Sequence, residues 1–303
     1  MADRIEQYLK YHADSSKAWD IDIQVEAIQF LTQYHRLSLE QRLWLSFLFA
    51  CTYCVPTAWY IFRSIPSWNA GTPEQLRGWW MREKAGLLFQ TDRKWLKSRN
   101  LFPAVVEDYR AMVRREAAGN PVPTQIDALK HLIRGGRTPQ ERYELLVRNA
   151  RVQQFGRFAM FLYSELLYHA GLPVVATLNL AEAESVKNGV VFALGMEERS
   201  YTGRHGRAST AEELAVLTAG LNEIVRRVQP MPMTARHHSI WSIETTLCAY
   251  KKWHLGKRYV GYYAERTLEE VRKMTALHPR FDWKPLNAFA ARYYPKLIRR
   301  KAK

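Results

Sequence analysis

The chain has 303 residues, of which 47% are hydrophobic and 24% charged, so it is long enough for one large domain or two modest ones with a buried core. Its 45 lysines and arginines outnumber 29 acidic residues, giving a formal net charge of +16, and 13% of its residues are aromatic. A chain both basic and aromatic suits nucleic acid, a polyanion that carries flat rings, better than a neutral metabolite.

Several protein classes are excluded by sequence features. Three cysteines (Cys51, Cys54 and Cys248) are too few for a disulfide scaffold, and their spacing predicts no metal site. The N-terminus lacks the apolar segment of a signal peptide. The most apolar stretch, residues 43–62, contains polar residues and Pro56, so it predicts a buried helix that ends near Pro56, with no membrane contact. Neither a P-loop nor a Rossmann fingerprint is present.

Helical periodicity dominates, so we predict a mainly α fold. Ser38 with Gln41 and Thr72 before Pro73 are typical helix starts. The expected helices cover residues 23–31, 38–50, 73–88, 103–118, 124–133, 138–170 (as one helix or two), 182–194, 211–228, 239–252 and 267–277, followed by a basic tail. Residues 173–179 give a weak indication of an extended segment.

A proline-rich stretch at residues 119–123 is the best candidate for a boundary between lobes. We therefore expect two closely packed lobes, an N-terminal helical lobe at 1–120 and a C-terminal helical lobe at 121–303 that carries the basic residues.

Positive charge is concentrated near the C-terminus. Residues 236–303 hold 16 lysines and arginines against five acids. Within them, a basic-aromatic cluster at residues 250–263 interleaves cations, tyrosines and two glycines. Its candidate DNA-binding residues are Lys251, Lys252, Lys257, Arg258, Tyr259, Tyr262 and Tyr263. Such side chains can clamp phosphates while rings stack on bases, at about 1–3 kcal/mol per base. The alternative is a solvated basic face with buried tyrosines.

Two carboxylates lie in otherwise apolar helical segments, Glu165 and Glu244. A carboxylate in such surroundings needs a partner, or its pKa rises and it becomes a usable acid or base. Arg157 precedes Glu165 by eight residues, close to the same helical face, and Asn188 is a polar position that could reach a pocket. The alternative for each is a structural ion pair or hydrogen bond.

Several short motifs resemble one bacteriophage family. They are Gly156-Arg157-Phe158 with Glu165, Ser185-x-x-Asn188-Gly189, Glu244-Thr245-Thr246-Leu247-Cys248-x-Tyr250-Lys251-Lys252 and Gly256-Lys257-Arg258-Tyr259-x-Gly261-Tyr262-Tyr263, with Thr91-Asp92-Arg93 as a further match. The family is the α-glutamyl/putrescinyl thymine pyrophosphorylases, also called amino acid:DNA transferases. The resemblance covers about residues 75–265 and implies a helical, DNA-glycosylase-like fold.

The resemblance also implies a reaction. An amine, from an amino acid or a polyamine, would displace pyrophosphate from 5-(pyrophosphoryloxymethyl)uracil in double-stranded phage DNA, in the cytoplasm of the infected bacterial host. Cations such as Arg157, Lys251 and Arg258 would stabilise the departing pyrophosphate. Glu165 or Glu244 would take a proton from the incoming ammonium, and a flipped base would stack on a tyrosine.

Other roles stay open at this point. Asp92 is either an active-site group or a helix cap, and Arg93 belongs to a second basic patch whose tryptophans could be core. Mg²⁺ could help to hold pyrophosphate, although no DxD-like cluster requires it and no cofactor is firmly predicted. The alternative function is a helical DNA-binding protein, or a glycosylase acting on modified bases, without amine transfer. No clear hairpin of the glycosylase type is visible in the sequence.

Replacing Lys257 and Arg258 together by alanine should weaken DNA binding. It should also reduce the slope of log affinity against log salt by about 2, because each phosphate contact releases about one counterion. Duplex titrations at several salt concentrations measure this slope, and an unchanged slope would place the DNA site elsewhere in the chain.

Overall fold

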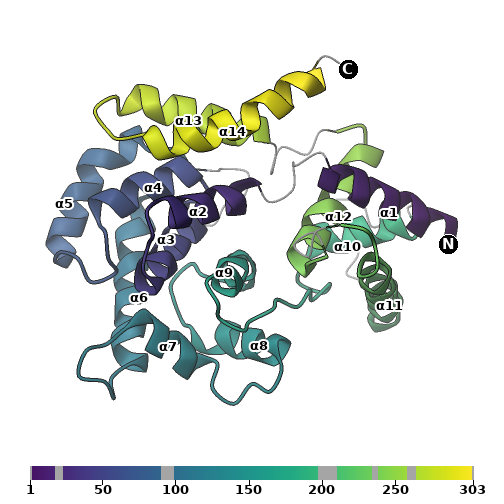
Figure 1. Ribbon diagram of the computed structural model, residues 1–303. Coiled ribbons are helices and arrows are strands. Elements are labelled where there is room, and N and C mark those ends of the chain that lie inside the picture. The colour runs from purple at the N-terminus through teal and green to yellow at the C-terminus, as the bar shows by residue number, and fades with distance from the viewer. Residues whose placement is uncertain are drawn as a thin grey trace. The chain divides into compact units, whose positions relative to one another are not determined.

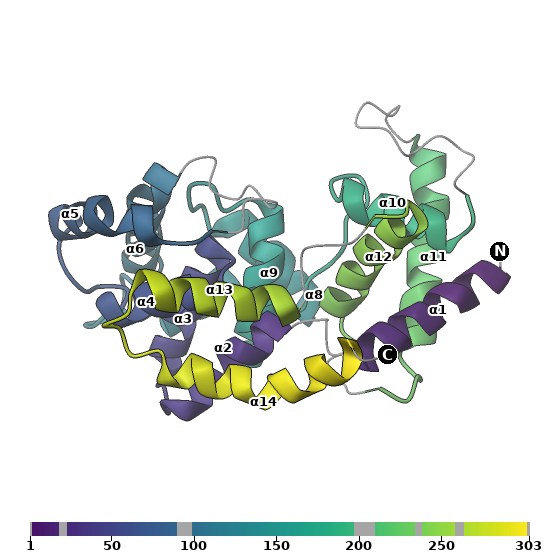
Figure 2. The same cartoon turned by 90° about the horizontal axis from the view of Figure 1, so that it is seen from above.

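The computed structural model describes residues 2–17, 23–89, 99–196, 210–233, 238–257 and 264–301. Within these ranges the chain forms 14 α-helices, two short 3-10 helices and no strand (Figures 1 and 2). The mainly α prediction is therefore confirmed. Nowhere in the described ranges does a helix combine the length and apolar character needed to cross a bilayer.

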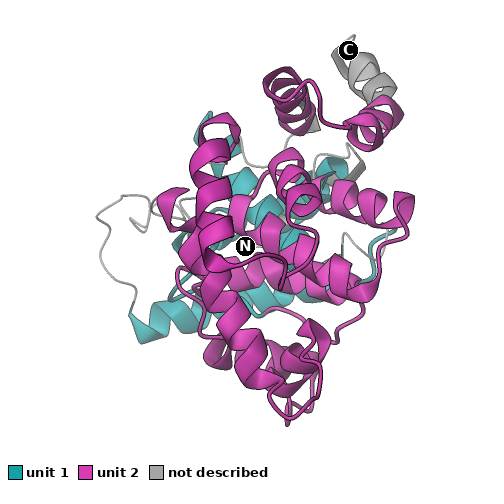
Figure 3. Cartoon of the chain, turned by 90° about the vertical axis from the view of Figure 1, so that its left-hand side faces the viewer, with its two compact units in different colours: residues 1–23, 177–263 teal, residues 24–176, 264–303 magenta. Residues whose placement is uncertain are grey.

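The helices group into two compact units (Figure 3). Unit 1 comprises residues 1–23 and 177–263, and unit 2 comprises residues 24–176 and 264–303. Each unit is thus assembled from two separate stretches of chain, whereas the expected lobes at 1–120 and 121–303 are each continuous. The lobe division stays a prediction.

Unit 1 is a group of four packed helices: α1 (Ala2–Lys17), α10 (Glu184–Ala193), α11 (Ala211–Val228) and α12 (Ile240–His254). Helix α10 packs against each of the other three, and Figures 1 and 2 show the four helices together. The core between them contains Tyr8, Val190 and Leu247, all fully buried. This core holds α10 and α12 side by side, which matters because the motifs around Asn188 and Glu244 lie on these two helices.

The contact between α10 and α12 is unusually close. A Cβ atom placed on Gly189 would lie 2.5 Å from the carbonyl oxygen of Leu247 and 2.7 Å from its carbonyl carbon. Only glycine permits this approach, because a side chain would collide with backbone that cannot rotate away. Gly220 in α11 is similarly placed, with a Cβ position 2.5 Å from Leu194 Cδ1.

Unit 2 is larger and centres on a helix buried on all sides. Its elements are α2 (Ile23–Tyr34), α3 (Leu39–Thr52), α4 (Val55–Ser64), α5 (Pro73–Glu83), η1 (Lys84–Gly86), η2 (Arg99–Leu101), α6 (Phe102–Glu116), α7 (Gln125–Leu132), α8 (Pro139–Asn149), α9 (Arg157–His169), α13 (Ala264–Leu277) and α14 (Lys284–Lys301). Helix α3 packs against α4, α7 and α9, and its residues 43–52 are all buried. It is apolar on every face, as a central core helix must be.

A carboxylate fixes α7 against α3. The two oxygens of Glu40 accept hydrogen bonds from the backbone N–H groups of Gln125 and Ile126, each 2.9 Å long. These N–H groups begin α7 and have no partner within the helix, so Glu40 satisfies them and complements the helix dipole.

Most sequence-predicted helices are observed. The capping boxes at Ser38, Thr72, Thr138 and Thr210 are present, each with the side chain three residues later returning a hydrogen bond. The segment 138–170 is two helices, α8 and α9. Residues 173–179, where the sequence indicates an extended segment, form neither a helix nor a strand in the structure.

Three expectations about helix positions need correction. Pro56 does not end a helix: α3 ends at Thr52, and Pro56 stands in the first turn of α4, where its missing N–H costs nothing. The expected basic tail contains helix α14, anchored by buried Leu286 and Phe289. Helix α1 was not anticipated, although its buried residues Ile5, Tyr8, Leu9 and His12 follow helical spacing.

We expect Gly189→Ala to lower the free energy of unfolding by about 1–3 kcal/mol, the range for overpacking a close contact. The matched control is Gly78→Ala in the interior of α5, where the new Cβ would lie 3.7 Å from a flexible arginine side chain. That control should gain up to about 1 kcal/mol from helix propensity. Urea denaturation of both variants tests the contrast, and equal effects would contradict the close crossing of α10 and α12.

Candidate active site

One cluster gathers polar residues from the facing sides of α10 and α12. It consists of Ser185, Asn188, Glu244, Cys248 and Lys251, here called the α10–α12 cluster. Ser185 and Asn188 are three residues apart on α10, and the other three are spaced by four and three on α12. Residues at these spacings share a helix face, so each helix turns its set to one side.

Hydrogen bonds connect most of this cluster. Lys251 Nζ donates to Ser185 Oγ at 2.9 Å. The Cys248 thiol lies 3.3 Å from Ser185 Oγ and also 3.3 Å from Glu244 Oε1. Thr245 Oγ1 donates to the other carboxylate oxygen, Oε2, at 3.3 Å. The cluster is therefore a continuous polar path between two helices.

The path runs from the surface into the interior of unit 1. Ser185 is exposed and Lys251 half-buried, whereas Cys248 and Glu244 are only 2% and 3% exposed. Burial lowers the pKa of Lys251, and nearby Lys252 lowers it further, while Cys248, Glu184 and Glu244 act in the opposite direction. A lysine of lowered pKa gives up its proton more readily than an ordinary surface lysine.

Asn188 adds an unsatisfied group to the cluster. Its side chain is 8% exposed, and its Oδ1 atom has no hydrogen-bond partner in the described part of the chain. Leaving a buried amide oxygen without a donor costs about 1–3 kcal/mol, so a native protein keeps such a group where a ligand or water completes it. The next residue, Gly189, has no side chain and so lets the backbone of α12 lie close to α10.

A second hydrogen-bonded group lies between α1 and α12. Thr246 Oγ1 lies 2.8 Å from the Tyr8 hydroxyl and 2.7 Å from His12 Nδ1, and all three residues are buried. Burial raises the pKa of the Tyr8 phenol, so the group stays protonated as a donor. These contacts fix α12 from the side of α1 and so hold Glu244 and Cys248 in place.

The other predicted catalytic residues in the described ranges lie in unit 2. Glu165 belongs to α9 and is 3% exposed, as expected for a carboxylate in an apolar segment. The Arg157 guanidinium donates two hydrogen bonds to the carboxylate of Glu144, 3.0 and 2.8 Å long. The structure thus gives Arg157 a carboxylate partner on α8, while roles for Glu165 and Arg157 in catalysis stay predictions.

The basic-aromatic cluster is described only in part. Lys252 is half-buried and Lys257 is exposed. Tyr250 is fully buried against Tyr8, as the alternative interpretation of the tyrosines requires. Trp253 is 60% exposed and was not singled out from the sequence. The remaining predicted residues lie outside the described ranges: Asp92, Arg93, Arg258, Tyr259, Tyr262 and Tyr263.

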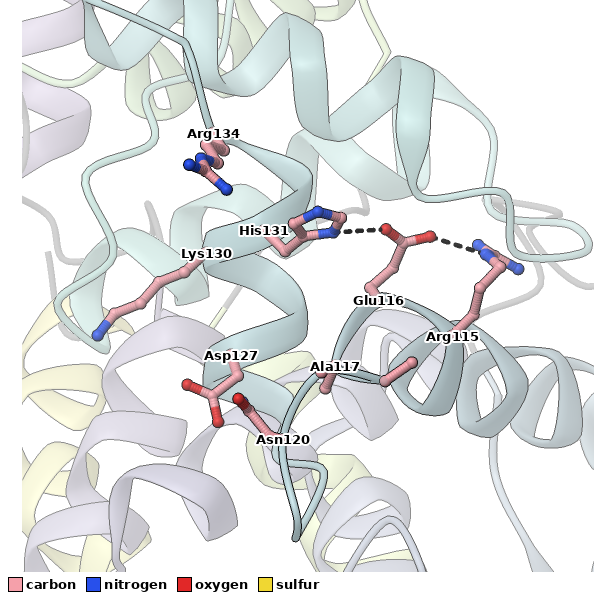
Figure 4. Close-up of a pocket in the computed structure, with 10 residues that line it drawn as sticks. Arg115, Glu116, Ala117, Asn120, Asp127, Lys130, His131 and Arg134 are labelled. Atoms are coloured by element: carbon pink, nitrogen blue, oxygen red, sulfur yellow. Dashed lines mark hydrogen bonds and ion pairs between the residues drawn. The ribbon is translucent and has the colours of Figure 1, made fainter.

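A cavity of about 460 Å³ opens on unit 2, between the C-terminal end of α6 and helix α7 (Figure 4). Figure 4 shows Glu116 bridging Arg115 and His131, with hydrogen bonds of 2.7 and 2.9 Å. Partial burial raises the pKa of Glu116, but the hydrogen bonds and the charges of Arg115 and His131 together outweigh burial, so the net pKa is lowered. None of the sequence-predicted site residues lines this cavity, so we do not regard it as the active site.

Comparison with known proteins identifies the family. The amino acid:DNA transferase family model matches residues 22–259, which is most of the chain. The chain belongs to the amino acid:DNA transferase family. It is also 24% identical over 285 residues to a serinyltransferase of Salmonella phage ViI, an alignment that covers 88% of this chain and 66% of the relative. The chain therefore spans just under two thirds of that relative's length.

The match to the amino acid:DNA transferases includes every residue of the α10–α12 cluster. Asn188, Glu244 and Lys251 were predicted from the sequence, and the structure brings their helices together. Ser185 and Cys248 were quoted only as parts of motifs. The contacts of Ser185 with Cys248 and Lys251 depend on two helices meeting, and no spacing within one segment could reveal them.

We expect Glu244→Gln to keep the fold and to lower the transfer rate by about 10²–10⁴-fold, the range for losing a general base. The matched comparison is Glu165→Gln, the other buried carboxylate in an apolar helix. Circular dichroism and urea denaturation check folding, and single-turnover kinetics measure the rate. Full activity of a folded Glu244→Gln variant would remove this residue from the mechanism.

Proposed function

We propose that this protein transfers an amino acid to a thymine-derived base in phage DNA, by displacing pyrophosphate from 5-(pyrophosphoryloxymethyl)uracil with the amino group. One observation carries the proposal: the family match coincides with a single hydrogen-bonded cluster of a carboxylate, a thiol, a hydroxyl and an amine. The name of the phage relative, a serinyltransferase, supports an amino acid as the transferred group.

The reaction is a substitution at the exocyclic methylene carbon of the base. The amine nitrogen forms a bond to this carbon, and the bond between the carbon and the pyrophosphate oxygen breaks with its electron pair going to oxygen. Charge develops on the departing pyrophosphate, so positioned cations lower the barrier. Lys251, Lys252 and Lys257 supply cations in unit 1, with Arg258 and Arg157 as further candidates.

The incoming amino group is an ammonium at neutral pH and must lose a proton before it can attack. Glu244 is the base favoured by the structure, because it is buried and connected by hydrogen bonds to the half-buried Lys251. Glu165 is the alternative base. A buried base is effective because its proton affinity is set by fixed neighbours and not by bulk water.

Recognition of the base needs a group that reads its edge and a surface on which it stacks. Thymine presents an N3–H donor between two carbonyl acceptors, and an asparagine amide can both accept and donate. Asn188 fits this role because its buried Oδ1 has no donor in the described part of the chain. To reach Asn188, the base would flip out of the DNA duplex. It would then stack on an exposed ring such as Trp253.

The co-substrate and the cellular setting follow from this chemistry. We propose an amino acid over a polyamine, and serine is the first to test because of the relative's name. The partner is double-stranded DNA that carries the modified thymine, so the protein would act in the cytoplasm of the infected bacterial host. No three His, Cys, Asp or Glu side chains in the described ranges group together as metal ligands.

The proposal is tested by incubating the purified protein with DNA that contains 5-(pyrophosphoryloxymethyl)uracil and with a mixture of amino acids and polyamines. Digestion to nucleosides and mass spectrometry should show a new thymidine adduct whose mass names the amine, together with released pyrophosphate. The Glu244→Gln variant is the negative control. Unchanged substrate despite DNA binding would contradict the proposal, and abasic sites would indicate a glycosylase instead.

A further inference from the structure

We propose that Ser185 and Cys248 form a proton relay between Lys251 and Glu244, so that Lys251 is the group that takes the proton from the incoming amine. The inference rests on the proposed function for its chemical role. It deepens that function by making Lys251 the direct proton acceptor, Glu244 the base that first removes a proton from Lys251, and Ser185 and Cys248 the positioning residues. It is tested partly without measuring activity.

The relay is visible as three consecutive contacts. They join Lys251 Nζ to Ser185 Oγ at 2.9 Å, Ser185 Oγ to Cys248 Sγ at 3.3 Å, and Cys248 Sγ to Glu244 Oε1 at 3.3 Å. Distances of this size are within the hydrogen-bond range for oxygen and for sulfur. An unbroken chain therefore connects a half-buried amine to a buried carboxylate.

The chemistry of the four groups gives the chain one consistent direction. The thiol carries a single proton and can donate to only one of its two oxygen neighbours at a time. When it donates to Glu244, the Ser185 hydroxyl can donate to sulfur and the Lys251 ammonium can donate to the hydroxyl. Each group then donates a hydrogen bond to the next, so all the hydrogen bonds run in one direction, from the Lys251 ammonium to the Glu244 carboxylate.

A shift of one proton along each link changes the charge of both ends. Lys251 becomes a neutral amine, Glu244 becomes a neutral carboxylic acid, and Ser185 and Cys248 regain the proton that each passes on. Burial favours this exchange, because a neutral pair loses less solvation than a charged pair in the interior. The exchange prepares an unprotonated amine at Lys251 without releasing a proton to solvent.

The neutral Lys251 amine then accepts the proton that the incoming ammonium must lose. The carbon–nitrogen bond forms, and pyrophosphate departs with the electron pair of the carbon–oxygen bond. Lys251 is now an ammonium beside the departing anion and can stabilise its charge. The relay explains how Glu244, which is only 3% exposed, can promote the loss of a proton from a substrate that lies outside helices α10 and α12.

The groups around Lys251 are consistent with this role. On α12 they are Glu244, Cys248 and Lys252, and on α10 the nearby charged group is Glu184. From α1, Tyr8 lies close enough to Cys248 and Glu244 for their charges to affect its phenol, which burial keeps protonated. Burial has the larger effect on the pKa of Lys251 and lowers it, whereas Glu244 raises it, so losing the Glu244 charge should lower the Lys251 pKa further.

The relay is tested by an NMR titration of Lys251 through its ¹³Cε resonance, assigned by its absence in Lys251→Arg. In the wild-type background, Glu244→Gln should lower the Lys251 pKa, because it removes the negative charge of Glu244. In a Cys248→Ala background the same substitution should have less than half this effect, and in Cys248→Ser the effect should return. Cys51→Ala, a buried cysteine in α3, is the matched control and should leave the titration unchanged.

Transfer kinetics provide the second measurement. Ser185→Ala and Cys248→Ala should lower kcat at neutral pH with KM unchanged and should move the pH–rate profile, whereas Cys248→Ser should restore both. An effect of Glu244→Gln on Lys251 that is equally large with and without the thiol would overturn the relay. If wild-type protein shows no transfer, the proposed function fails, while the titration still decides whether the relay exists.

Discussion

The close crossing of α10 and α12 at Gly189 is the constraint on which unit 1 depends. With a Cβ position 2.5 Å from the Leu247 carbonyl oxygen, no other residue permits the two backbones to lie so near each other. The short distance lets two small side chains, a serine and a cysteine, make a hydrogen bond across the helix pair. With wider spacing, long flexible side chains would be needed, and these would lose more conformational entropy for each contact.

Several buried polar groups in both units are satisfied by a partner from a different element. Glu40 of α3 completes the first N–H groups of α7, and Thr246 of α12 binds Tyr8 and His12 of α1. Arg110 of α6 donates to the carbonyl oxygens of Trp68 and Gly71 in the loop before α5. The Asn188 amide oxygen has no such partner in the described part of the chain, and it contributes to the assignment of the site because it lies in the α10–α12 cluster.

Local features of the fold were predictable from sequence because their causes are local. Ser38, Thr72, Thr138 and Thr210 begin helices by hydrogen bonds to residues three positions later, and such pairs are visible in the sequence. Pro56 was misread because proline fits the start of a helix as well as its end. The tail at α14 was misread because its charges concealed Leu286 and Phe289, three residues apart on one face. The Ser185–Cys248 contact has no local cause, and it required the structure.

Helix α1 completes the core of unit 1, although the whole of residues 24–176 separates it from its partners. During synthesis α1 leaves the ribosome long before α10, α11 and α12 exist, so its apolar face must remain unburied in the meantime. Contacts between such distant segments slow folding, because a long loop must close before they form. Residues 264–303 follow unit 1 in the chain but belong to unit 2, so the two segments of unit 2 cannot meet until all of unit 1 has been translated.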